Sequence, residues 1–427
     1  MDLSIILPTI NEERNVAILL RSLRRAVTPL GVSYEVLVVD GGSKDHTVRE
    51  AQASRAYGLP VRVIEQRRAG YGEALREGIE QARGQYVLTL DADLSHNPGL
   101  IPALWRARNS AHVVIASRYV PGGSADMPWV RFVLSCILNR FFSKFLSLPF
   151  RDLSSGFRLY QASVVKDMKV TSVHFDVLEE MLINAYANGW KVLEIPFRFR
   201  PRKKGKSKVR FVTFALSFLL TFAKIWRLRN SIECGDYDDR AYDSRIPLQR
   251  YWQRRRVGIL TGWASGARTV LDIGCGSSRA LAKLGPVIGV DLLMRKLRFA
   301  LRFGKPLVNG SIWNIPFLDR SVDCVICSEV VEHIPAGDGP FLEMRRVLKP
   351  GGKLILGTPD YSRRTWCILE WIYARVAPGG YAHEHMTHYD FKGLKALVER
   401  LGFRVRDVRY ICHSEMILLC EFVNTGT

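Results

Sequence analysis

The feature that most constrains this sequence is an alternation of short apolar runs with helix-like segments, which occurs twice along the chain. In the first half the apolar runs cover Leu3–Leu7, Tyr34–Asp40, Val61–Glu65 and Tyr86–Asp91. In the second half they cover Thr269–Ile273, Val287–Asp291, Val322–Ser328 and Lys353–Thr358. Strands that alternate with crossover helices build largely parallel sheets. The sequence therefore predicts the α/β fold class in two separate domains.

Length and composition agree with this division. At about 150 residues per domain, 427 residues hold two or three domains. A content of 47% hydrophobic and 24% charged residues provides for packed cores and excludes a mainly disordered chain. Residues 232–253 are rich in Asp, Arg and Tyr and lack a long apolar period, as expected of a linker. We predict a first domain over residues 1–232 and a second over residues 233–427.

The cysteines and the start of the sequence indicate the compartment. The eight cysteines are irregularly spaced, and the first residues lead straight into a predicted strand. Neither feature is typical of a secreted protein held together by disulfides. We therefore expect a reducing, cytosolic location without a signal peptide.

Two apolar stretches interrupt the strand and helix pattern of the first domain, near residues 129–150 and 209–227. The second contains 13 uncharged residues between Arg210 and Lys224. As a helix this run spans about 20 Å, less than the hydrocarbon core of about 30 Å. We expect both stretches to form helices that lie along a membrane interface. A buried core helix and a membrane span are the alternatives.

Two carboxylates follow the fourth apolar run. Asp91 and Asp93 stand one residue apart at the expected carboxyl end of a strand. Acids in this position can share one hard divalent cation, Mg²⁺ or Mn²⁺, which would neutralise a diphosphate leaving group. Two solvated loop acids would look the same, so the prediction depends on the motifs around the pair.

The positive charge has a definite position in the sequence. The formal net charge of +21 suits nucleic acid, an anionic membrane surface or phosphorylated substrates. Its densest part is residues 198–208, where seven basic residues and no acidic one directly precede the apolar stretch. Phosphate groups at a membrane surface fit this junction. We therefore expect no nucleic-acid partner, and a basic RNA methyltransferase is the alternative.

Five ordered segments of the first domain identify a family. They are Leu7 to Glu13, Val38 to Ser43, Leu90 to Asp93, Ala116 to Tyr119 and Asp152 to Arg158. The set resembles the family 2 glycosyltransferases with the nucleotide-diphosphosugar, or GT-A-like, fold, and the dolichyl-phosphate mannose synthases in particular. This resemblance covers about residues 1–225.

The resemblance implies roles for individual residues. The residues implied to bind the nucleotide sugar and the acceptor are Pro8, Glu12, Asp40, Ala92, Arg202, Ser207 and Lys208. The residues implied to carry the chemistry are Asp91, Asp93, Arg118, Arg131 and Asp152, of which the first two also hold the metal. The nucleobase, guanine or uracil, stays open.

The reaction implied is inverting transfer of a hexose, with mannose favoured, to polyprenyl or dolichyl phosphate. A lipid monophosphate is already ionised at neutral pH, so the enzyme needs cations more than it needs a general base. A polysaccharide or protein hydroxyl is the alternative acceptor, and Asp152 would then act as the base.

A glycine-rich loop follows the first strand of the second domain. Gly274 and Gly276 lack side chains, which lets the backbone approach a ligand closely. Nineteen residues after Asp272, Asp291 ends the next strand, where an acid can bind ribose hydroxyls. With residues 310–317, 328–333 and 348–352, the set resembles the class I S-adenosylmethionine methyltransferases of Rossmann-like fold. The residues implied to bind S-adenosylmethionine are Asp272, Gly274, Gly276, Asp291 and Ser311.

A second metal site is a further hypothesis for this domain. Glu329, Glu332 and His333 stand at i, i+3 and i+4, and a helix would place them on one face. His385 or His383 would complete a ligand set. Packing of the loop is the alternative explanation.

Two cysteines have the spacing of a metal pair but are expected to pack in the sheet. Cys324 and Cys327 lie in a predicted strand, where positions i and i+3 face opposite sides.

These features together predict a bifunctional enzyme. We expect a peripheral protein on the cytoplasmic face of a membrane that makes a lipid-linked sugar and methylates that sugar or a later glycan. Neither the methyl acceptor nor the oligomeric state follows from the sequence.

Overall fold

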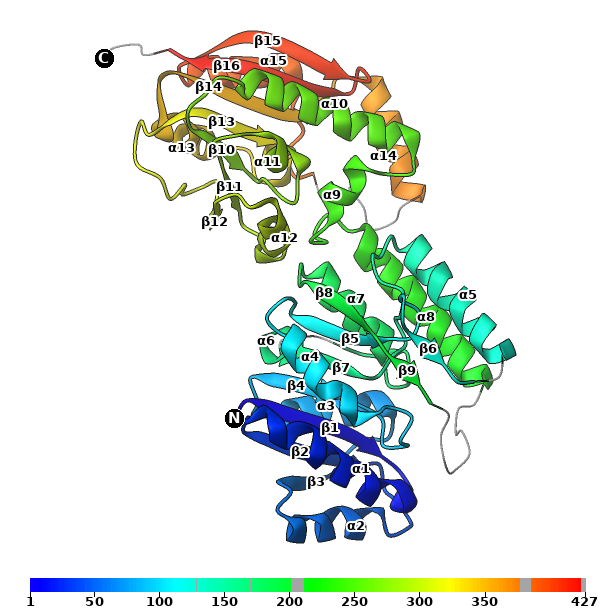
Figure 1. The fold of residues 1–427 in the computed structure, drawn as a ribbon. Helices are drawn as coiled ribbons and strands as arrows, with labels where there is room; N and C mark the ends of the chain where they lie inside the picture. Colours follow the sequence, from blue (N-terminus) through cyan, green and yellow to red (C-terminus); the bar gives the residue numbers. More distant parts are fainter. Residues whose placement is uncertain (128, 167, 169, 201–210, 377–384, 424–427) are drawn as a thin grey trace. The chain divides into compact units, whose positions relative to one another are not determined.

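A computed structural model describes the chain except for residues 128, 167, 169, 201–210, 377–384 and 424–427, and except for the side chains of residues 131, 211–219, 373, 374 and 376. The chain forms two compact units (Figure 1). Unit 1 comprises residues 1–186 and 190–226, and unit 2 comprises residues 187–189 and 227–427.

Unit 1 is built on a mixed seven-stranded sheet of order β3-β2-β1-β4-β7-β5-β8. The strands are β1 Leu3–Thr9, β2 Tyr34–Asp40, β3 Val61–Glu65, β4 Tyr86–Thr89, β5 Val113–Ser117, β7 Arg158–Gln161 and β8 Val192–Pro196. Only β7 runs antiparallel to its neighbours in this sheet. A separate two-stranded ladder pairs β6 Ser124–Ala125 with β9 Arg198–Phe199. The predicted α/β class is confirmed for this unit.

Helices cover the sheet because each has an apolar side. In α1 the buried residues Val16, Leu19, Leu20 and Leu23 recur with helical spacing and join the core cluster of the sheet. The other helices of this layer are α2 Thr47–Ala53, α3 Tyr71–Gln81, α4 Ile101–Ala107, α6 Ala162–Lys166 and α7 Val177–Ala187, and α1 itself is Glu13–Val27.

Two longer helices, α5 Trp129–Phe145 and α8 Phe211–Asn230, correspond to the two apolar stretches. They lie side by side, with the Phe142 and Phe222 rings 4.9 Å apart between centroids (Figure 1). The helix α8 continues past the predicted apolar run to Asn230, and in this extension the Lys224 ammonium pairs with the buried Glu180 carboxylate. Within the described residues, no helix is both long enough and apolar enough to cross a membrane.

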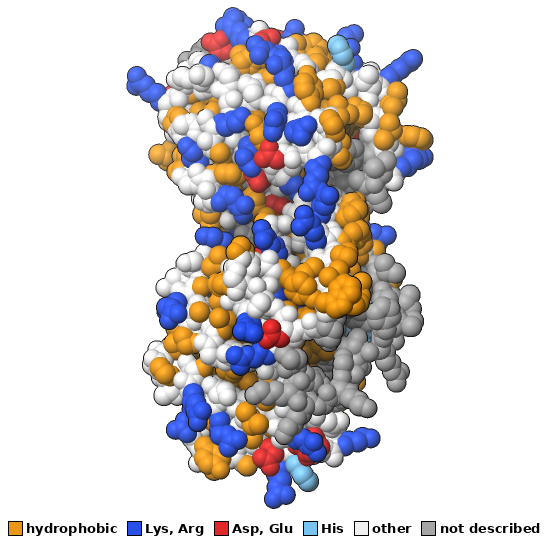
Figure 2. Space-filling model, turned by 45° about the vertical axis from the view of Figure 1, so that its right-hand side comes forward, with side chains coloured by type: hydrophobic (Ala, Val, Ile, Leu, Met, Phe, Trp, Pro, Cys, Tyr) orange, Lys and Arg blue, Asp and Glu red, His pale blue; other side chains and the backbone are white. Residues whose placement is uncertain are grey.

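The helix α5 exposes an apolar stripe. Leu134, Ile137, Phe141 and Phe145 are 61%, 60%, 43% and 53% exposed, and their spacing of three or four residues places them along one side of the helix. Figure 2 shows hydrophobic side chains gathered on this face of the molecule. A helix that belongs only to a water-facing surface would instead turn its polar residues outward.

Unit 2 has its own seven-stranded sheet, of order β12-β11-β10-β13-β14-β16-β15. The strands are β10 Val270–Ile273, β11 Val287–Asp291, β12 Leu307–Asn309, β13 Val322–Ser328, β14 Leu348–Pro359, β15 Phe403–Ile411 and β16 Glu415–Phe422. The first five in this order are parallel, and β16 is antiparallel to both neighbours. Within β13, Cys324 and Cys327 are buried in two different core clusters, which confirms their predicted packing.

The helices of unit 2 begin inside the predicted linker. They are α9 Tyr237–Tyr242, α10 Pro247–Ala264, α11 Arg279–Lys283, α12 Met294–Ala300, α13 Gly339–Val347, α14 Arg364–Val376 and α15 Phe391–Arg400. Residues 232–253 therefore contain α9 and the start of α10. The boundary between the two compact units falls between residues 226 and 227.

Candidate functional sites

The sheet of unit 1 brings its predicted site residues to one edge. The strands β1, β2 and β4 are parallel, and β5 runs the same way because β4 and β5 are both antiparallel to β7. The segments after these four strands therefore emerge beside the segment that precedes β7. These segments contribute Asp40, Asp91, Asp93, Arg118 and Asp152.

Asp91 and Asp93 lie in the turn after β4. The Asp91 side chain is 31% exposed, and its Oδ1 accepts a hydrogen bond from the Tyr71 hydroxyl at 2.9 Å. Asp93 Oδ1 accepts one from the Ser95 backbone N–H at 3.0 Å. Gly156, just before β7, is so near that a Cβ on it would lie 3.4 Å from Asp91 Oδ1. Two accessible carboxylates at this edge are the oxygen donors that a hard divalent cation needs, so the residues fit the implied metal.

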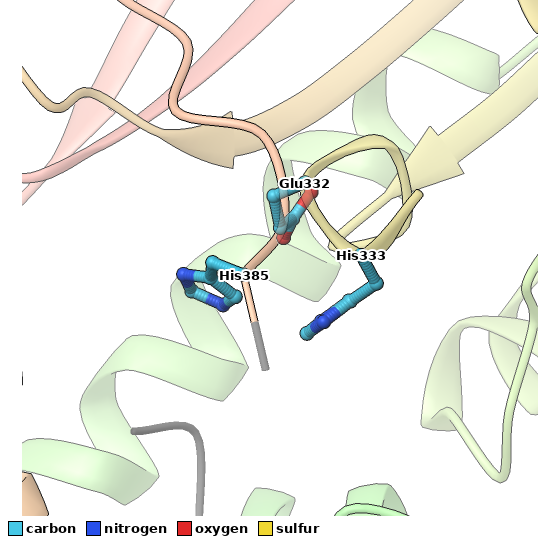
Figure 3. Close-up of side chains that lie close together, drawn as sticks. All are labelled: Glu332, His333 and His385. Carbon is cyan, nitrogen blue, oxygen red and sulfur yellow. The ribbon is translucent and has the colours of Figure 1, made fainter. Parts of the chain in front are cut away.

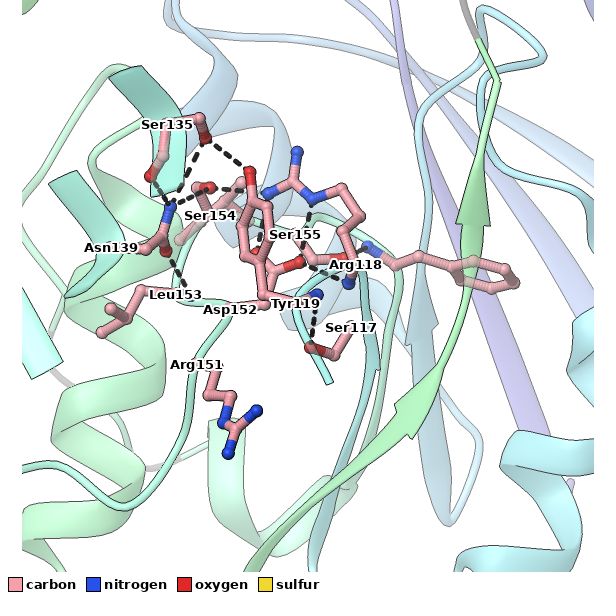
Figure 4. Close-up of polar contacts among 12 residues, drawn as sticks. Ser117, Arg118, Tyr119, Ser135, Asn139, Arg151, Asp152, Leu153, Ser154 and Ser155 are labelled. Carbon is pink, nitrogen blue, oxygen red and sulfur yellow. Dashed lines mark hydrogen bonds and ion pairs between the residues drawn. The ribbon is translucent and has the colours of Figure 1, made fainter. Parts of the chain in front are cut away.

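Arg118 and Asp152 form a buried ion pair (Figure 4). The Asp152 carboxylate accepts hydrogen bonds from Nε of Arg118 at 2.8 Å and from Nη2 at 2.7 Å. Asp152 has no exposed surface, and the Arg118 side chain is 11% exposed. Asn139 of α5 holds the adjoining loop, because its Oδ1 accepts from the Leu153 backbone N–H at 2.8 Å. Both Asp152 oxygens are thus committed to positioning the Arg118 guanidinium.

Replacing Asp152 with Asn should lower both stability and sugar transfer. The variant leaves a largely buried guanidinium without its counter-charge, which costs roughly 3–5 kcal/mol. Chemical denaturation and a pH profile of sugar transfer check this result, and Asp126→Asn, an exposed acid paired with Arg198, is the control. We expect the residual activity to keep the wild-type pH profile. A stable variant that loses the acid limb of the profile would instead identify Asp152 as a general base.

The turn after β2 is organised by Asp40. Its carboxylate accepts hydrogen bonds from the Ser43 backbone N–H at 2.8 Å and from Ser43 Oγ at 2.5 Å. Ser43 Oγ in turn accepts from the backbone N–H of Asn11, after β1, at 2.8 Å. Pro8 and Glu12 flank this connection in the sequence. Pro8, Glu12 and Asp40, which are predicted to bind the nucleotide sugar, therefore lie on adjoining segments.

Sequence reasoning missed several buried polar residues beside this edge. His96 Nδ1 accepts from the Asp91 backbone N–H at 3.1 Å, and burial lowers the pKa of His96. Arg158 is fully buried and donates to the Leu178 carbonyl at 2.6 Å. Burial raises the pKa of Glu179 to about 8. Two sequence signals could have indicated these residues. His96 stands three residues after the second acid, and Arg158 is an arginine in a strand.

The other predicted residues of unit 1 differ in how far the structure places them. Ala92 is buried between the two acids. Arg202, Ser207 and Lys208, and the side chain of Arg131, lie outside the described part of the chain. Their assignments stay predictions.

The sheet of unit 2 likewise gathers its predicted residues at one edge, because β10, β11 and β12 are parallel. Gly274 and Gly276 have φ values of 67° and 54°, in the region that favours glycine. A Cβ on Gly274 would lie 2.2 Å from Cγ2 of Val330. The Asp291 carboxylate accepts from the Gly276 backbone N–H at 2.8 Å. The glycine loop lets a ligand approach its backbone, and an acid lies beside it at the end of β11. This arrangement fits a nucleoside-containing cofactor such as S-adenosylmethionine.

Two further predicted residues lie on the same sheet, in β10 and after β12. Burial, together with Asp291 and Asp238, raises the pKa of Asp272 to about 8. Ser311 follows β12, and its Oγ accepts from the Trp313 backbone N–H at 3.3 Å.

The helix α9 contributes an acid that sequence reasoning missed. Asp238 Oδ2 accepts from the Ser277 backbone N–H at 3.0 Å and pairs with Lys296 Nζ at 2.9 Å. A Cβ on Gly276 would lie 2.3 Å from the same oxygen. The segment expected to be a linker therefore packs on the glycine loop.

Three of the four residues of the second metal hypothesis come together (Figure 3). Candidate ligand atoms of Glu332, His333 and His385 lie within 4.8 Å of one another. Glu329 instead pairs with Arg256, at 3.1 Å. Residues Val331–His333 form a 3₁₀ turn rather than an α-helix, and the φ of 59° at Glu329 prevents an earlier helix start. The alternative ligand, His383, lies outside the described residues.

Each half of the chain matches a protein family model. Residues 4–168 match glycosyl transferase family 2, and residues 271–356 match a methyltransferase domain. These ranges contain the acidic pair after β4 and the glycine loop after β10.

Known proteins resemble the first half. A dolichol-phosphate mannosyltransferase of Pyrococcus furiosus is 35% identical over 221 residues, which are 49% of this chain and 60% of that protein, so the match leaves much of that relative uncovered. A polyprenol monophosphomannose synthase of Mycolicibacterium smegmatis is 34% identical over 218 residues, which cover 48% of this chain and 80% of that protein. Glucosyl-3-phosphoglycerate synthase of Mycobacterium tuberculosis, solved with Mn²⁺ and UDP-glucose, matches 52% of this chain and 79% of its own at 20% identity and a TM-score of 0.40.

Proposed function

Because the chain belongs to glycosyl transferase family 2 and also carries a methyltransferase domain, we propose that it is a bifunctional enzyme of lipid-linked sugar synthesis. The first domain transfers a hexose, with mannose favoured, from a nucleotide sugar to polyprenyl or dolichyl phosphate with inversion. The second transfers a methyl group from S-adenosylmethionine to a glycan acceptor. The observation that carries the proposed sugar transfer is that Asp91, Asp93 and the buried ion pair of Arg118 and Asp152 lie at one edge of the sheet.

The described residues divide the work of sugar transfer. A divalent cation, Mg²⁺ or Mn²⁺, held by Asp91 and Asp93 supplies positive charge for the diphosphate leaving group. Arg118 presents a guanidinium, fixed by Asp152, to the phosphates of donor and acceptor. The acceptor phosphate is already ionised, so alignment and charge neutralisation are the main contributions that the protein must make.

A hydroxyl acceptor on a polysaccharide or protein is less well supported. It would need a general base, and Asp152 would have to give up hydrogen bonds to Arg118 to become one. The names of the two relatives described above also favour a polyprenyl or dolichyl phosphate.

We place the protein peripherally on the cytoplasmic face of a membrane, and the apolar stripe of α5 supports the contact with the membrane. Exposed Leu, Ile and Phe side chains on one helix side, with an exposed Trp129 at the helix start, are the composition of an interfacial helix. The same helix holds the Asp152 loop through Asn139. A lipid phosphate bound near Arg118 would then have its hydrocarbon chain beside this stripe.

Replacing both Leu134 and Ile137 with Glu should weaken binding to anionic vesicles at least about tenfold, because burying each side chain contributes about 1.5–3 kcal/mol. Vesicle sedimentation measures this binding. Ile18→Glu, at an exposed apolar position on α1, is the matched control. Transfer to a short, water-soluble polyprenyl phosphate should stay at the wild-type rate in all variants. Unchanged vesicle binding by the double variant would contradict a membrane role for α5.

The methyl-transfer half is supported by the glycine loop and Asp291. Left-handed φ values at both glycines and a hydrogen bond between Gly276 and Asp291 make a compact cradle at the sheet edge. A sugar hydroxyl is the proposed acceptor because the same chain carries a sugar-transferring domain, although fusion alone raises only effective concentration.

One experiment tests both halves. The full chain is incubated with labelled nucleotide sugars, polyprenyl phosphate and Mg²⁺ or Mn²⁺, with and without S-adenosylmethionine, and the lipid products are analysed by mass spectrometry. A hexose-phosphate lipid that gains one methylene mass only with S-adenosylmethionine supports both activities. An unmethylated lipid product would indicate that the methyl group is transferred to a later glycan. No lipid product with any donor overturns the proposed sugar transfer.

A further inference from the structure

Glu332, His333 and His385 of unit 2 form a cluster outside the set of residues predicted to bind S-adenosylmethionine (Figure 3). The first two lie in the turn after β13, and His385 lies between α14 and α15. Two imidazoles and a carboxylate are a donor set for divalent ions of the first transition series. We infer that this cluster binds such a cation and thereby holds an oxygen of the methyl acceptor.

Glu332 gives independent support for a bound cation. The residue is fully buried, and one of its carboxylate oxygens accepts from Thr358 Oγ1 at 3.1 Å. The other oxygen, Oε1, has no hydrogen-bond partner within the described part of the chain. A buried carboxylate oxygen without a partner is unfavourable, and a cation among the three side chains would supply one.

The contacts of His385 indicate which of its nitrogens is able to bind a cation. The Tyr361 hydroxyl donates to Glu370 Oε1 at 3.0 Å and lies 2.6 Å from Nδ1 of His385. Because its only proton goes to Glu370, the hydroxyl accepts a hydrogen bond from Nδ1–H. His385 is then the tautomer whose Nε2 carries the lone pair. Metal-binding histidines in proteins are typically fixed in this way through their second nitrogen.

The cluster borders the cofactor loop. Val330, two residues before Glu332, packs so closely on Gly274 that a Cβ there would lie 2.2 Å away. An acceptor hydroxyl held at the cluster would therefore be close to the methyl donor, a step that rests on the proposed methyl transfer. A cation lowers the pKa of a bound hydroxyl, so its proton can leave to solvent. The oxygen attacks the methyl carbon, the carbon–sulfur bond breaks with its electron pair moving to sulfur, and S-adenosylhomocysteine leaves.

The test titrates the full chain with Mn²⁺ and follows the free ion by electron paramagnetic resonance. The variant Asp91→Asn/Asp93→Asn removes the ligands proposed in unit 1, so the remaining ion reports the cluster. We expect about one ion per chain in this background and at least about tenfold weaker binding when Glu332→Gln or His333→Gln is added. Tyr361→Phe should weaken binding by about 10- to 100-fold through loss of orientation. His413→Asn, at an exposed histidine of unit 2, should change nothing.

Calorimetric binding of S-adenosylmethionine to the same variants separates the outcomes. Unchanged cofactor binding shows that the variants fold, so a loss of Mn²⁺ binding then supports the cluster. Equal Mn²⁺ binding with and without the Glu332 and His333 changes overturns the cation site. If the cluster binds Mn²⁺ but the rate of methyl transfer is unchanged by added chelator, only the proposal that the cation holds the methyl acceptor is overturned. Failure to bind S-adenosylmethionine in the wild-type chain refutes the proposed methyl transfer, while the Mn²⁺ titration stays interpretable.

Discussion

Replacing Asp91 with Asn should lower sugar transfer by about 10²- to 10³-fold, the usual loss when one group that stabilises developing charge is removed. The amide keeps the shape of the carboxylate and can still accept the hydrogen bond from Tyr71. It loses the negative charge that attracts the cation and weakens the neutralisation of the leaving diphosphate. The side chain is 31% exposed, so the fold should tolerate the change.

Release of nucleoside diphosphate over a range of Mn²⁺ concentrations measures this effect. We expect the Mn²⁺ concentration needed for half-maximal rate to rise together with the loss of rate. Asp126→Asn, which neutralises an exposed acid of the same unit, should leave both quantities at wild-type values. Tyr71→Phe removes only the hydrogen bond and should cost much less than Asp91→Asn. A full rate with unchanged Mn²⁺ dependence in Asp91→Asn would show that this acid does not hold the metal.

Most strands that the sequence predicted are largely buried, but burial alone does not decide, because the partly exposed β3 was predicted and the fully buried β5 was not. The bounds of β2, β11 and β13 agree with their apolar runs, because strands covered by helices on both sides must be apolar throughout. The strand β7 was not predicted, since it begins with Arg158 and holds only four residues. Its place between β4 and β5 depends on pairing with residues far away in the sequence, which no local pattern encodes.

The candidate sites show the same limit. Family motifs placed both Arg118 and Asp152 at the first site, but the ion pair between them joins residues 34 positions apart and follows only from the fold. Helical spacing predicted that Glu329 would join Glu332 and His333. The positive φ at Glu329 redirects its side chain to Arg256, and His385 completes the cluster from another segment.

Replacing Gly274 with Ala should weaken S-adenosylmethionine binding at least about a hundredfold and leave sugar transfer unchanged. Two costs add at this position. The φ of 67° disfavours any residue with a Cβ by about 1–2 kcal/mol. The new methyl group would also lie 2.2 Å from Cγ2 of Val330, so the loop or the turn after β13 must move. Either movement displaces the backbone that is proposed to bind the cofactor.

Two further variants separate these costs in calorimetric titrations with S-adenosylmethionine. Gly266 has a φ of 83°, and a Cβ added to it would meet open space among the described residues. Gly266→Ala therefore carries the backbone cost alone and should bind the cofactor normally. Adding Val330→Ala to Gly274→Ala removes both methyl groups nearest the new Cβ. The double variant should bind the cofactor at least about tenfold more tightly than Gly274→Ala.

The outcomes of these titrations distinguish the contact from the backbone. If Gly274→Ala bound the cofactor as tightly as the wild-type chain, the glycine loop would not be its cradle. If the double variant regained nothing, the left-handed backbone, rather than the contact with Val330, would be the property on which binding depends.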